Sequence, residues 1–400
     1  MSGPLPGFVR AALERRLTDR SDEVGWRRDA RRSAAESLLR EGLPTLAHED
    51  WRFTSLERLV SADLDRGGES MTHVTAAPAG VRVMRLRTWL SDHPDAAQAS
   101  LEARLPLAED PFVRLDRAVG DGGVVITVVK GQETESPLRI EHVLGPQQLG
   151  VTRVVVVLEP GARATVLETV MGGRGAYANI VTDVHLGRDA QLEHVRLVSD
   201  SAALHVGRLR ARVGQDASLT ARSVVLGGAL ARVDVGVDLA EPGAAVTVDG
   251  LYVASESQHV DHHIHLHHRV PHTKSDVRAR GIVGGSGRAV FNGHILVDKQ
   301  APKSDAQLSN KNLLLSKGAR VHTQPRLEIF TDDVKCSHGA TVGQIDPAQI
   351  FYLRSRGLSA EVARRLLVHA FASELTARLP VADLRDEVDR WLLHHMGLAE

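Results

Sequence analysis

The sequence contains a single cysteine, Cys336, among 400 residues. One cysteine excludes an internal disulfide framework and any Cys-rich cluster site completed within one chain. Aromatic residues make up only 4% of the chain, which is poor material for a sugar-binding cleft. The longest unbroken aliphatic run, 154–158, is far too short to span a bilayer, so we expect no membrane association.

The chain also lacks a net charge of either sign. Lys plus Arg total 49 and Asp plus Glu total 50, so the formal net charge is −1. A balanced charge argues against nucleic acid and anionic membranes as partners, because both select basic surfaces. No basic segment followed by an apolar one is visible at the N-terminus. We therefore expect a cytoplasmic protein in a reducing compartment.

Three catalytic motifs are absent as well. The sequence has no Gly-Lys dipeptide and hence no Walker A loop, no Gly-x-Ser-x-Gly elbow and no His-Glu-x-x-His helix. Asp332 and Asp333 are adjacent, so on a strand they would face opposite sides and form a poor acid–base pair. The chain itself is therefore not expected to be a P-loop ATPase.

Helical and β-rich sequence patterns follow one another along the chain. Up to about residue 110, apolar residues at helical spacing over 8–17 and 26–39 predict helices, and 61–80 reads as a loop. Between 111 and 345, turn residues separate short β-branched runs, which include 124–129, 151–158, 176–186 and 191–198. From 346 to 400 the pattern is helical again. We expect three domains: 1–110 helical, 111–345 β-rich and 346–400 helical.

The C-terminal segment predicts three helices. Asp346 can cap a helix that Gly357 ends, and Ser359 can cap a second helix that ends before Pro380. A third helix is expected over 384–396. The second helix should bury an apolar stripe formed by Val362, Leu366, Leu367, Ala370, Phe371 and Leu375.

A glycine turn recurs in the β-rich part. Copies of the form Gly-x-x-Ala/Val-x-Val/Leu begin at Gly161, Gly187, Gly214 and Gly243, with looser copies from Gly287 and Gly318. The intervals are 26, 27, 29, 44 and 31 residues, and the interval of 44 requires an insertion around a His-rich stretch. Each glycine should adopt a positive φ at a corner. Since strand–turn–strand units bury their inner faces only against their neighbours, we expect a β-solenoid in preference to a sandwich.

The sharpest candidate site is Cys336 with His338. Residues i and i+2 of a strand point the same way, so a thiolate and an imidazole can address one soft centre such as iron, zinc or a sulfur species. Two ligands make half of a tetrahedral site, and the others must come from elsewhere in the chain or from a partner protein. The alternative is a buried cysteine near a hydrogen-bonded histidine.

The His-rich stretch 258–272 is a second candidate. Read as a strand, it has His259, Asp261, His263, His265 and His267 on one face, and Val260, His262, Ile264, Leu266 and His268 on the other. Same-face histidines could bind a metal or act as a pH-sensitive edge. We favour a solvated edge strand protected against aggregation for His263, His265 and His267. His259 and His262 stay open as metal ligands.

Five long motifs lie at 259–262, 311–316, 325–329, 332–344 and 350–357, and a shorter Trp-Arg-Phe-Thr element lies within 49–54. Together they resemble the SufD branch of the SufB/SufD family of iron–sulfur cluster assembly scaffold proteins. Between about residues 60 and 150 the resemblance is slight. The cysteine-bearing segments of the SufB branch are missing.

The resemblance implies a right-handed parallel β-helix between helical domains, the same layout as the sequence pattern predicts. It implies a non-enzymatic scaffold subunit in a complex with SufB and with SufC, the ABC-type ATPase that hydrolyses ATP. Cys336 and His338 would then lie at the SufB interface, where a transient iron–sulfur cluster is built, and this chain alone would hold no cofactor stably. The C-terminal helices would dock SufC through Ile350, Phe351, Leu353, Arg354 and Arg356.

Two other functions are alternatives. A secreted-type β-helix polysaccharide lyase or hydrolase predicts a secretion signal, an aromatic groove and clustered carboxylates, and the sequence shows none of these. A stand-alone metal-binding repeat protein would bind metal stably as an isolated chain. The sequence leaves open whether the isolated chain forms homodimers, whether the complex binds a flavin, and which cluster type results.

Overall fold

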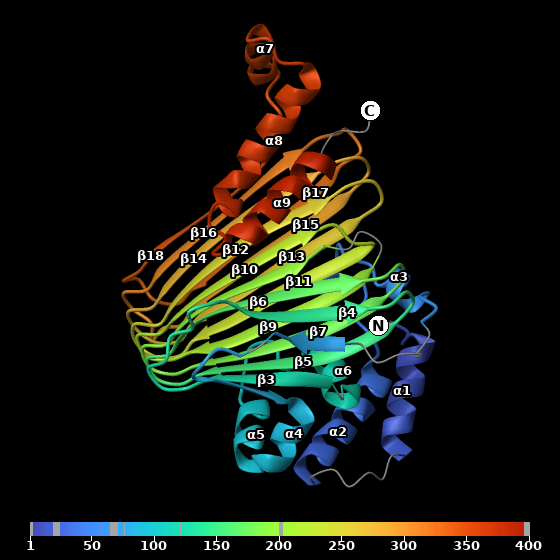
Figure 1. Cartoon of the computed structure of the whole chain (residues 1–400), viewed down its shortest axis with the longest axis vertical. Helices are drawn as coiled ribbons and strands as arrows, with labels where there is room; N and C mark the ends of the chain where they lie inside the picture. The colour runs from blue at the N-terminus through green and yellow to red at the C-terminus, as the bar shows by residue number, and fades with distance from the viewer. Residues whose placement is uncertain are drawn as a thin grey trace.

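The computed structural model describes residues 3–18, 25–64, 71–75, 77–120, 122–199 and 203–395. Its centre is a flattened parallel β-helix whose successive strands alternate between two sheets, with helices near both ends of the chain (Figure 1). The predicted solenoid flanked by helices is confirmed.

Each sheet has nine strands. In spatial order, the first sheet contains β1 (Met71–Val74), β4 (Leu138–Leu144), β6 (Arg163–Gly172), β8 (Gln191–Val198), β10 (Ser218–Leu226), β12 (Ala245–Ala254), β14 (Lys274–Val283), β16 (Asp305–Leu314) and β18 (Lys335–Gln344). The second sheet contains β2 (Val81–Arg85), β3 (Gly122–Val128), β5 (Leu149–Leu158), β7 (Tyr177–Leu186), β9 (Leu204–Val213), β11 (Leu230–Leu239), β13 (His259–His268), β15 (Arg288–Val297) and β17 (Arg320–Ile329).

The two ends of the solenoid differ. At one end β1 and β2 add antiparallel to β4 and β3, whereas the pairs from β3 and β4 onward are parallel. The expected loop over 61–80 is therefore wrong for 71–74, which form β1; residues 65–70 and 76 lie outside the described part. At the other end, β17 and β18 are the last strands of their sheets.

The turns that lead from the second sheet to the first stack on one another. One residue of each turn has a positive φ: it is the third residue after β5, β7 and β9 (Gly161, Asp189 and Asp216) and the fourth after β11 (Gly243). The N–H of Asp189 donates to the Gln215 carbonyl of the next turn (2.9 Å), as the N–H of Gly161 does to Arg188 (2.8 Å). The expected positive φ at Gly187 and Gly214 is therefore wrong.

Gly187 and Gly214 are instead sites of close backbone approach. A Cβ on Gly214 would lie 2.6 Å from the carbonyl oxygen of Leu186, and one on Gly187 would lie 3.0 Å from the nitrogen of Pro160. Each glycine begins a turn that passes directly over the preceding coil. The repeat is therefore real, but at Gly187 and Gly214 it is close contact between coils, and not a positive φ, that calls for glycine.

The 44-residue interval contains no insertion. Three strands, β12, β13 and β14, lie between Gly243 and Gly287, whereas two strands lie in each of the other intervals. Gly287 and Gly318 therefore lie in turns at the opposite edge, which lead from the first sheet to the second. The expectation of an insertion is wrong because this interval spans one and a half coils, from a turn at one edge to a turn at the other.

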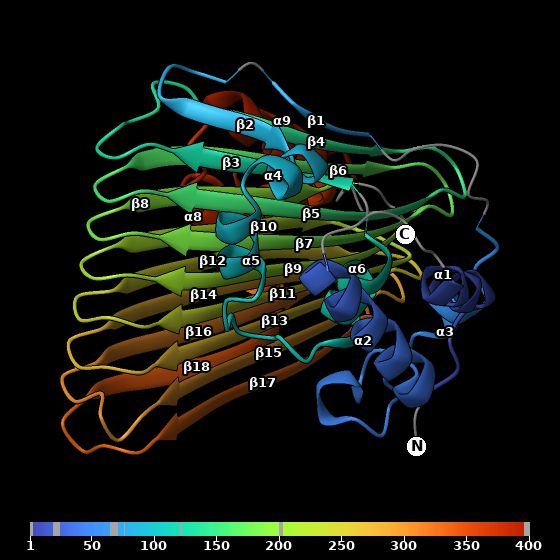
Figure 2. The same ribbon diagram turned by 90° about the horizontal axis from the view of Figure 1, so that it is seen from below.

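Helices cover the outer faces of both sheets. α1 (Gly7–Thr18), α2 (Gly25–Glu41), α4 (Leu86–Asp92), α5 (Pro94–Leu101) and α6 (Pro111–Val119) pack over the second sheet (Figure 2). Two short elements, η1 (Glu49–Trp51) and α3 (Glu57–Val60), follow α2. The helices predicted over 8–17 and 26–39 are confirmed as α1 and α2.

The C-terminal helices are α7 (Pro347–Ser355), α8 (Ala360–Thr376) and α9 (Ala382–His395). Asp346 caps α7 by accepting from the N–H of Ala348 (2.8 Å), and Ser359 caps α8 by accepting from the N–H of Val362 (3.2 Å). Gly357 follows α7 with a φ of 90°. These caps are confirmed, and Met396, the last residue of the expected third helix, lies outside the described part. None of the described helices has the length and apolar character needed to cross a membrane.

The predicted apolar stripe of α8 is correct in part. Leu375 is buried and Phe371 packs partly buried against the same cluster, which joins the helix to the first sheet and α9. Val362 and Leu366 are 41% and 44% exposed. Val368 and Ala372, which lie outside the predicted stripe, are buried in this cluster instead.

Candidate functional site

The open end of the solenoid, formed by β17 and β18, is the candidate site. Each of these strands has a neighbour on one side only, so the backbone groups on its other side have no ladder partner. Apolar side chains lie exposed at this end: Ile329 is 39%, Val342 46% and Phe330 60% exposed. Exposed strand edges with apolar side chains invite pairing with another chain.

Cys336 and His338 lie on β18 at this open end. Cys336 pairs in register with Ala306 and His338 with Leu308, and both of these β16 residues are buried in the solenoid core. Neighbours in register point to the same face of a sheet, so Cys336 and His338 both face the inner side of the last coil, as their spacing predicts. The structure therefore brings these two predicted residues together.

The two side chains differ in burial. Cys336 is half-buried and packs against the end of the apolar core, whereas His338 is exposed. Burial raises the pKa of the Cys336 thiol above its usual value. The alternative, a buried cysteine near a hydrogen-bonded histidine, does not match this half-buried cysteine and exposed histidine.

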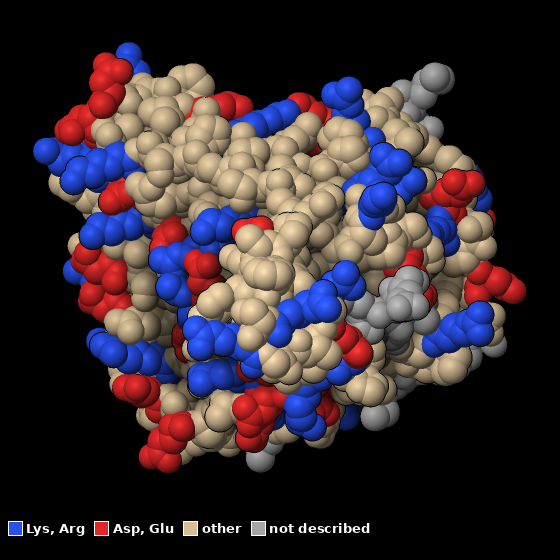
Figure 3. Space-filling model, turned by 90° about the horizontal axis from the view of Figure 1, so that it is seen from above, with Lys and Arg blue, Asp and Glu red and all other residues tan. Residues whose placement is uncertain are grey.

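Charged side chains of both signs surround this end of the molecule. In the view from above, toward the end that carries α7, Lys and Arg are intermixed with Asp and Glu around a broad uncharged area (Figure 3). The surface in this view is therefore not a basic patch, in keeping with the net charge of −1.

The His-rich strand β13 is not an edge strand. It pairs with β11 on one side and with β15 on the other, so the expected solvated edge is wrong for His263, His265 and His267. The predicted alternation of its faces is confirmed, because Val260, Ile264 and Leu266 lie in the core of the solenoid. Strand order comes from the stacking of coils, which the local sequence does not reveal.

His259 and His262 lie on opposite faces of β13. The ring of His259 is 3.0 Å from the hydroxyl of Thr54. The ring of His262 lies inside the solenoid, where it is hydrogen-bonded to Ser223 and packs against Tyr252. Burial lowers the pKa of His262 to about 4. The structure does not bring this pair together, so they cannot share one metal ion.

The N-terminal element around η1 contacts the outer face of the second sheet. The Trp51 ring lies 3.7 Å from the Arg232 guanidinium carbon, and the Thr54 hydroxyl donates to Asp261 at 2.6 Å. The Phe53 ring stacks on His322 of β17, with centroids 4.1 Å apart. The Trp-Arg-Phe-Thr element and the motif at 259–262, which are about 200 residues apart in the chain, thus contact each other in the fold.

A buried ionic network inside the solenoid went unnoticed in the sequence. Glu168 accepts from Arg196 (3.0 Å) and contacts His142 (3.1 Å) and His194 (2.8 Å). Although burial raises its pKa, Arg196 and the two histidines hold the pKa of Glu168 well below the usual range. Every partner is on a neighbouring strand, so both oxygens of Glu168 are satisfied within the fold, whereas Nδ1 of His194 and Nε and Nη1 of Arg196 have no hydrogen-bond partner among the described residues.

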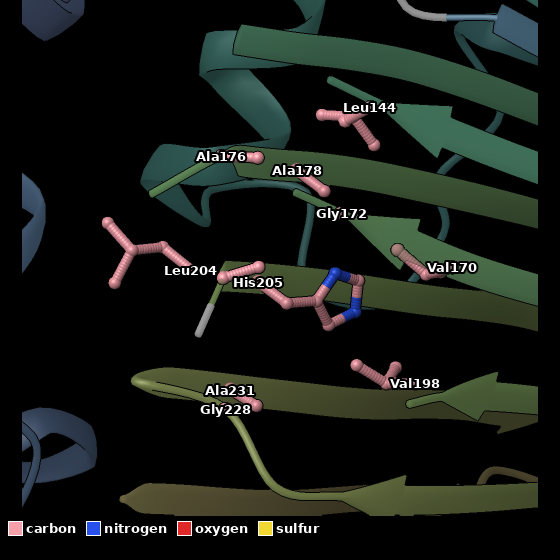
Figure 4. Close-up of a pocket in the computed structure, with 11 residues that line it drawn as sticks. Leu144, Val170, Gly172, Ala176, Ala178, Val198, Leu204, His205, Gly228 and Ala231 are labelled. Atoms are coloured by element: carbon pink, nitrogen blue, oxygen red, sulfur yellow. The ribbon is translucent and has the colours of Figure 1, made fainter. Parts of the chain in front are cut away.

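A small cavity lies near one edge of the solenoid interior. Apolar residues such as Leu144, Val170 and Val198 line it, and the ring of His205 points into it (Figure 4). Its volume of about 10 Å³ has room for about one water molecule. Burial lowers the pKa of His205 to about 3. The cavity is therefore too small to be a substrate site.

The predicted docking helix α7 stands apart from the solenoid (Figure 1). It buries none of its side chains; Phe351 is 74% and Tyr352 57% exposed, while Ile350 and Leu353 are half-buried. Arg354 and Arg356 are exposed as well. A groove of about 470 Å³ runs between α7 and the end of the first sheet, lined by Leu314, Leu315, Ile345, Ile350, Phe351 and Arg354, among others.

Comparison with known proteins identifies the family. The model of the SUF system FeS cluster assembly SufBD core domain matches residues 142–371. The iron-sulfur cluster assembly protein SufD of Escherichia coli (strain K12) is 33% identical over 377 residues, with 88% of this chain and 89% of that protein covered. SufD of Bacillus subtilis (strain 168) is 25% identical over 323 residues, with 77% and 72% covered.

An iron-sulfur cluster assembly SufBD family protein of Synechocystis sp. is 29% identical over 401 residues, with 89% of this chain and 88% of that protein covered. The family match contains both the His-rich strand β13 and the Cys336–His338 pair. It spans more than half of the chain, and the Escherichia coli relative extends over most of the remainder. This chain therefore belongs to the SufB/SufD family of iron–sulfur cluster assembly proteins of the SUF system.

Proposed function

We propose that this chain is a non-enzymatic scaffold subunit that pairs with a SufB-like partner and helps to assemble an iron–sulfur cluster at their interface. The observation that carries the proposal is the open end of the solenoid, where Cys336 and His338 face the inner side of the last coil on a terminal strand with one free edge. A partner that adds its own strands to β17 and β18 would cover both free edges and the apolar side chains between them.

The chemistry of the pair suits a shared cluster. A thiolate and an imidazole are ligands for iron and zinc, but this chain offers only two of the four that a tetrahedral centre needs. Because burial raises the pKa of Cys336, binding of the soft centre must displace the thiol proton. The cluster is therefore cargo that is shared with the partner, and this chain by itself does not hold the cluster stably.

A SufC-like ATPase is the second proposed partner. The sequence has no Walker A loop, so ATP hydrolysis must come from another subunit. The exposed helix α7, with Phe351 and Tyr352 on its surface and an apolar groove beside it, is the proposed docking site. Ile350, Leu353, Arg354 and Arg356 would contribute to the same contact.

The open end also suggests how the chain behaves without its partner. In the absence of the SufB-like partner, two copies of this chain could cover each other's edges, so we propose that the isolated chain forms a homodimer through β17 and β18.

The cytoplasmic location expected from the sequence is part of the proposed function. The β-helix polysaccharide lyase finds no support in the family match.

Co-purification from cells that express this chain with its SufB-like and SufC-like partners tests the proposal. Val342→Asp at the open end should prevent capture of the SufB-like subunit, because a carboxylate would be buried in the interface. Val143→Asp is the matched control, since Val143 is similarly exposed (40%) on β4 near the opposite end of the solenoid. Capture that is equal for the two variants would contradict pairing through the open end.

A further inference from the structure

A cluster of potential metal ligands lies on the outer face of the second sheet, away from the open-end pair. Asp234 of β11 and His263 and His265 of β13 each offer a ligand atom, and these three atoms lie within 4.8 Å of one another. Asp234 is paired in register with His263, and His265 is the next residue on the same face. Both strands are interior to the sheet, so the three positions are rigidly held.

The buried polar atoms of this cluster are incompletely satisfied. His263 is 2% exposed, yet neither of its ring nitrogens has a hydrogen-bond partner among the described residues. Its Nε2 lies 2.9 Å from Oδ1 of Asp261 and forms an ion pair with it, but the contact does not have the geometry of a hydrogen bond. The Nδ1 of His263 thus has neither a hydrogen-bond partner nor an ion pair. A buried nitrogen in this state is unfavourable, and coordination to a cation would relieve it.

The carboxylate of Asp234 retains a free acceptor position. Oδ2 forms an ion pair with Nη1 of Arg208 (2.6 Å) and accepts from Nε of Arg232 (2.9 Å), whereas Oδ1 accepts only from Nη2 of Arg232 (2.9 Å). A carboxylate has about four acceptor positions.

The surrounding charges favour a cation despite the two guanidinium groups. Arg208 also pairs with Asp110 (3.0 Å), and Arg232 also pairs with Asp261 (3.0 Å). Three buried or nearly buried carboxylates thus face two arginines, which leaves a negative excess beside the histidines. Such an excess in a region of low dielectric attracts a positive ion.

His265 is the half-buried member of the cluster, whereas Asp234 and His263 are buried. His265 also has a neighbour that leads toward the surface: its ring centroid is 6.2 Å from that of His294, whose Nε2 lies 3.1 Å from the half-exposed Glu328. These side chains connect the cluster to a half-exposed carboxylate.

We propose that Asp234, His263 and His265 form a binding site for one divalent transition-metal ion of the Fe²⁺, Co²⁺ or Zn²⁺ class. Two imidazoles and one carboxylate suit these metals, whereas Ca²⁺ and Mg²⁺ prefer oxygen ligands throughout. Three protein ligands leave a coordination position for water or another small ligand. The proposal does not depend on the assembly function, because it requires only that the folded chain bind the ion.

Titration of the purified, tag-free and metal-free full chain with Co²⁺ tests the proposal. The experiment uses a Cys336→Ala/His338→Ala background, so that any signal is independent of the open-end pair. We expect one Co²⁺ per chain, with the visible absorption of a nitrogen-ligated ion and displacement by Zn²⁺. His263→Gln and His265→Gln should each weaken binding by about 100-fold or more, since even outer-shell changes cost 10–100-fold.

His267→Gln is the matched control, because His267 lies on the same strand and face but contacts Asp298 instead (2.9 Å). It should bind Co²⁺ like its parent. Thermal unfolding verifies that each variant folds, and if His263→Gln does not, the half-buried His265 carries the test. Absence of binding by the parent, or equal affinity in the parent and in the His263→Gln/His265→Gln double variant, would overturn the proposal.

Discussion

At the scale of single residues, Cys336 and His338 differ in burial, and this decides what their replacement should do. Cys336→Ala removes a half-buried side chain at the end of the core and should lower the free energy of unfolding by about 1 kcal/mol. His338→Ala changes an exposed residue and should leave stability unchanged. If the pair serves the cluster, both variants should lower cluster assembly in cells.

Ser337→Ala provides the control for this prediction. Ser337 lies between the two residues but on the other face of β18, where its hydroxyl donates to Gln307. Thermal unfolding and a cellular assay of cluster-dependent enzymes are the two measurements. Unfolding of either alanine variant at the growth temperature, or normal assembly with both residues replaced, would contradict the role at the interface.

At the scale of elements, stacked turns place a strict limit on side-chain size. A Cβ on Gly214 would lie 2.6 Å from the carbonyl oxygen of Leu186, and backbone cannot easily move away. Gly214→Val should therefore lower the free energy of unfolding by about 1–3 kcal/mol or more. Gly339→Ala on β18 is the comparison, because nothing lies within 4 Å of its Cβ position. If the two variants unfolded at the same urea concentration, the turn backbone would have to move aside more easily than the structure implies.

The helix α7 offers a test of the proposed ATPase docking site. Truncation after Gln344 is a poor test, because it also removes α8 and α9 and exposes the apolar outer face of the first sheet. Phe351→Asp is sharper, since Phe351 is 74% exposed and the fold does not need it. This variant should lose the SufC-like ATPase in a pull-down and retain the SufB-like subunit. Retention of the ATPase, or loss of both partners from a folded variant, would place the docking site elsewhere.

At the scale of the whole molecule, buried histidines make stability depend on pH. Burial lowers the pKa of His205 to about 3 and those of His262 and His268 to about 4. In the unfolded chain each has a pKa of about 6.5. Below pH 6.5 the unfolded chain therefore binds protons that the folded protein excludes, and stability falls as the pH falls toward 4. Above pH 6.5 the three residues contribute no pH dependence.

Each such histidine should reduce the free energy of unfolding by about 1.4 kcal/mol per pH unit over this window. Urea unfolding at a series of pH values measures the slope. His205→Leu should make the slope shallower and leave stability at pH 7 equal or higher, because His205 lies among apolar side chains without hydrogen bonds (Figure 4). An unchanged slope in this variant would mean that His205 is protonated in the folded protein.

Local sequence determined much of the fold and the first candidate pair. Short β-branched runs and regularly spaced turns predicted a solenoid, because a strand that repeats in this way can bury its inner face only against the next coil. Asp346 and Ser359 predicted helix starts, since capping involves only the following turn. Cys336 and His338 share a face because the side-chain period of a strand is two.

Only the tertiary structure decided which strands are interior and which residues meet between coils. β13 looks like an edge strand by composition, yet coil stacking places it between β11 and β15. The contact of Thr54 with Asp261 joins segments far apart in the chain, and the pairing of Asp234 with His263 depends on the register of two successive coils. Such contacts follow from the number of residues in each intervening coil and turn, which no local pattern of residue types specifies.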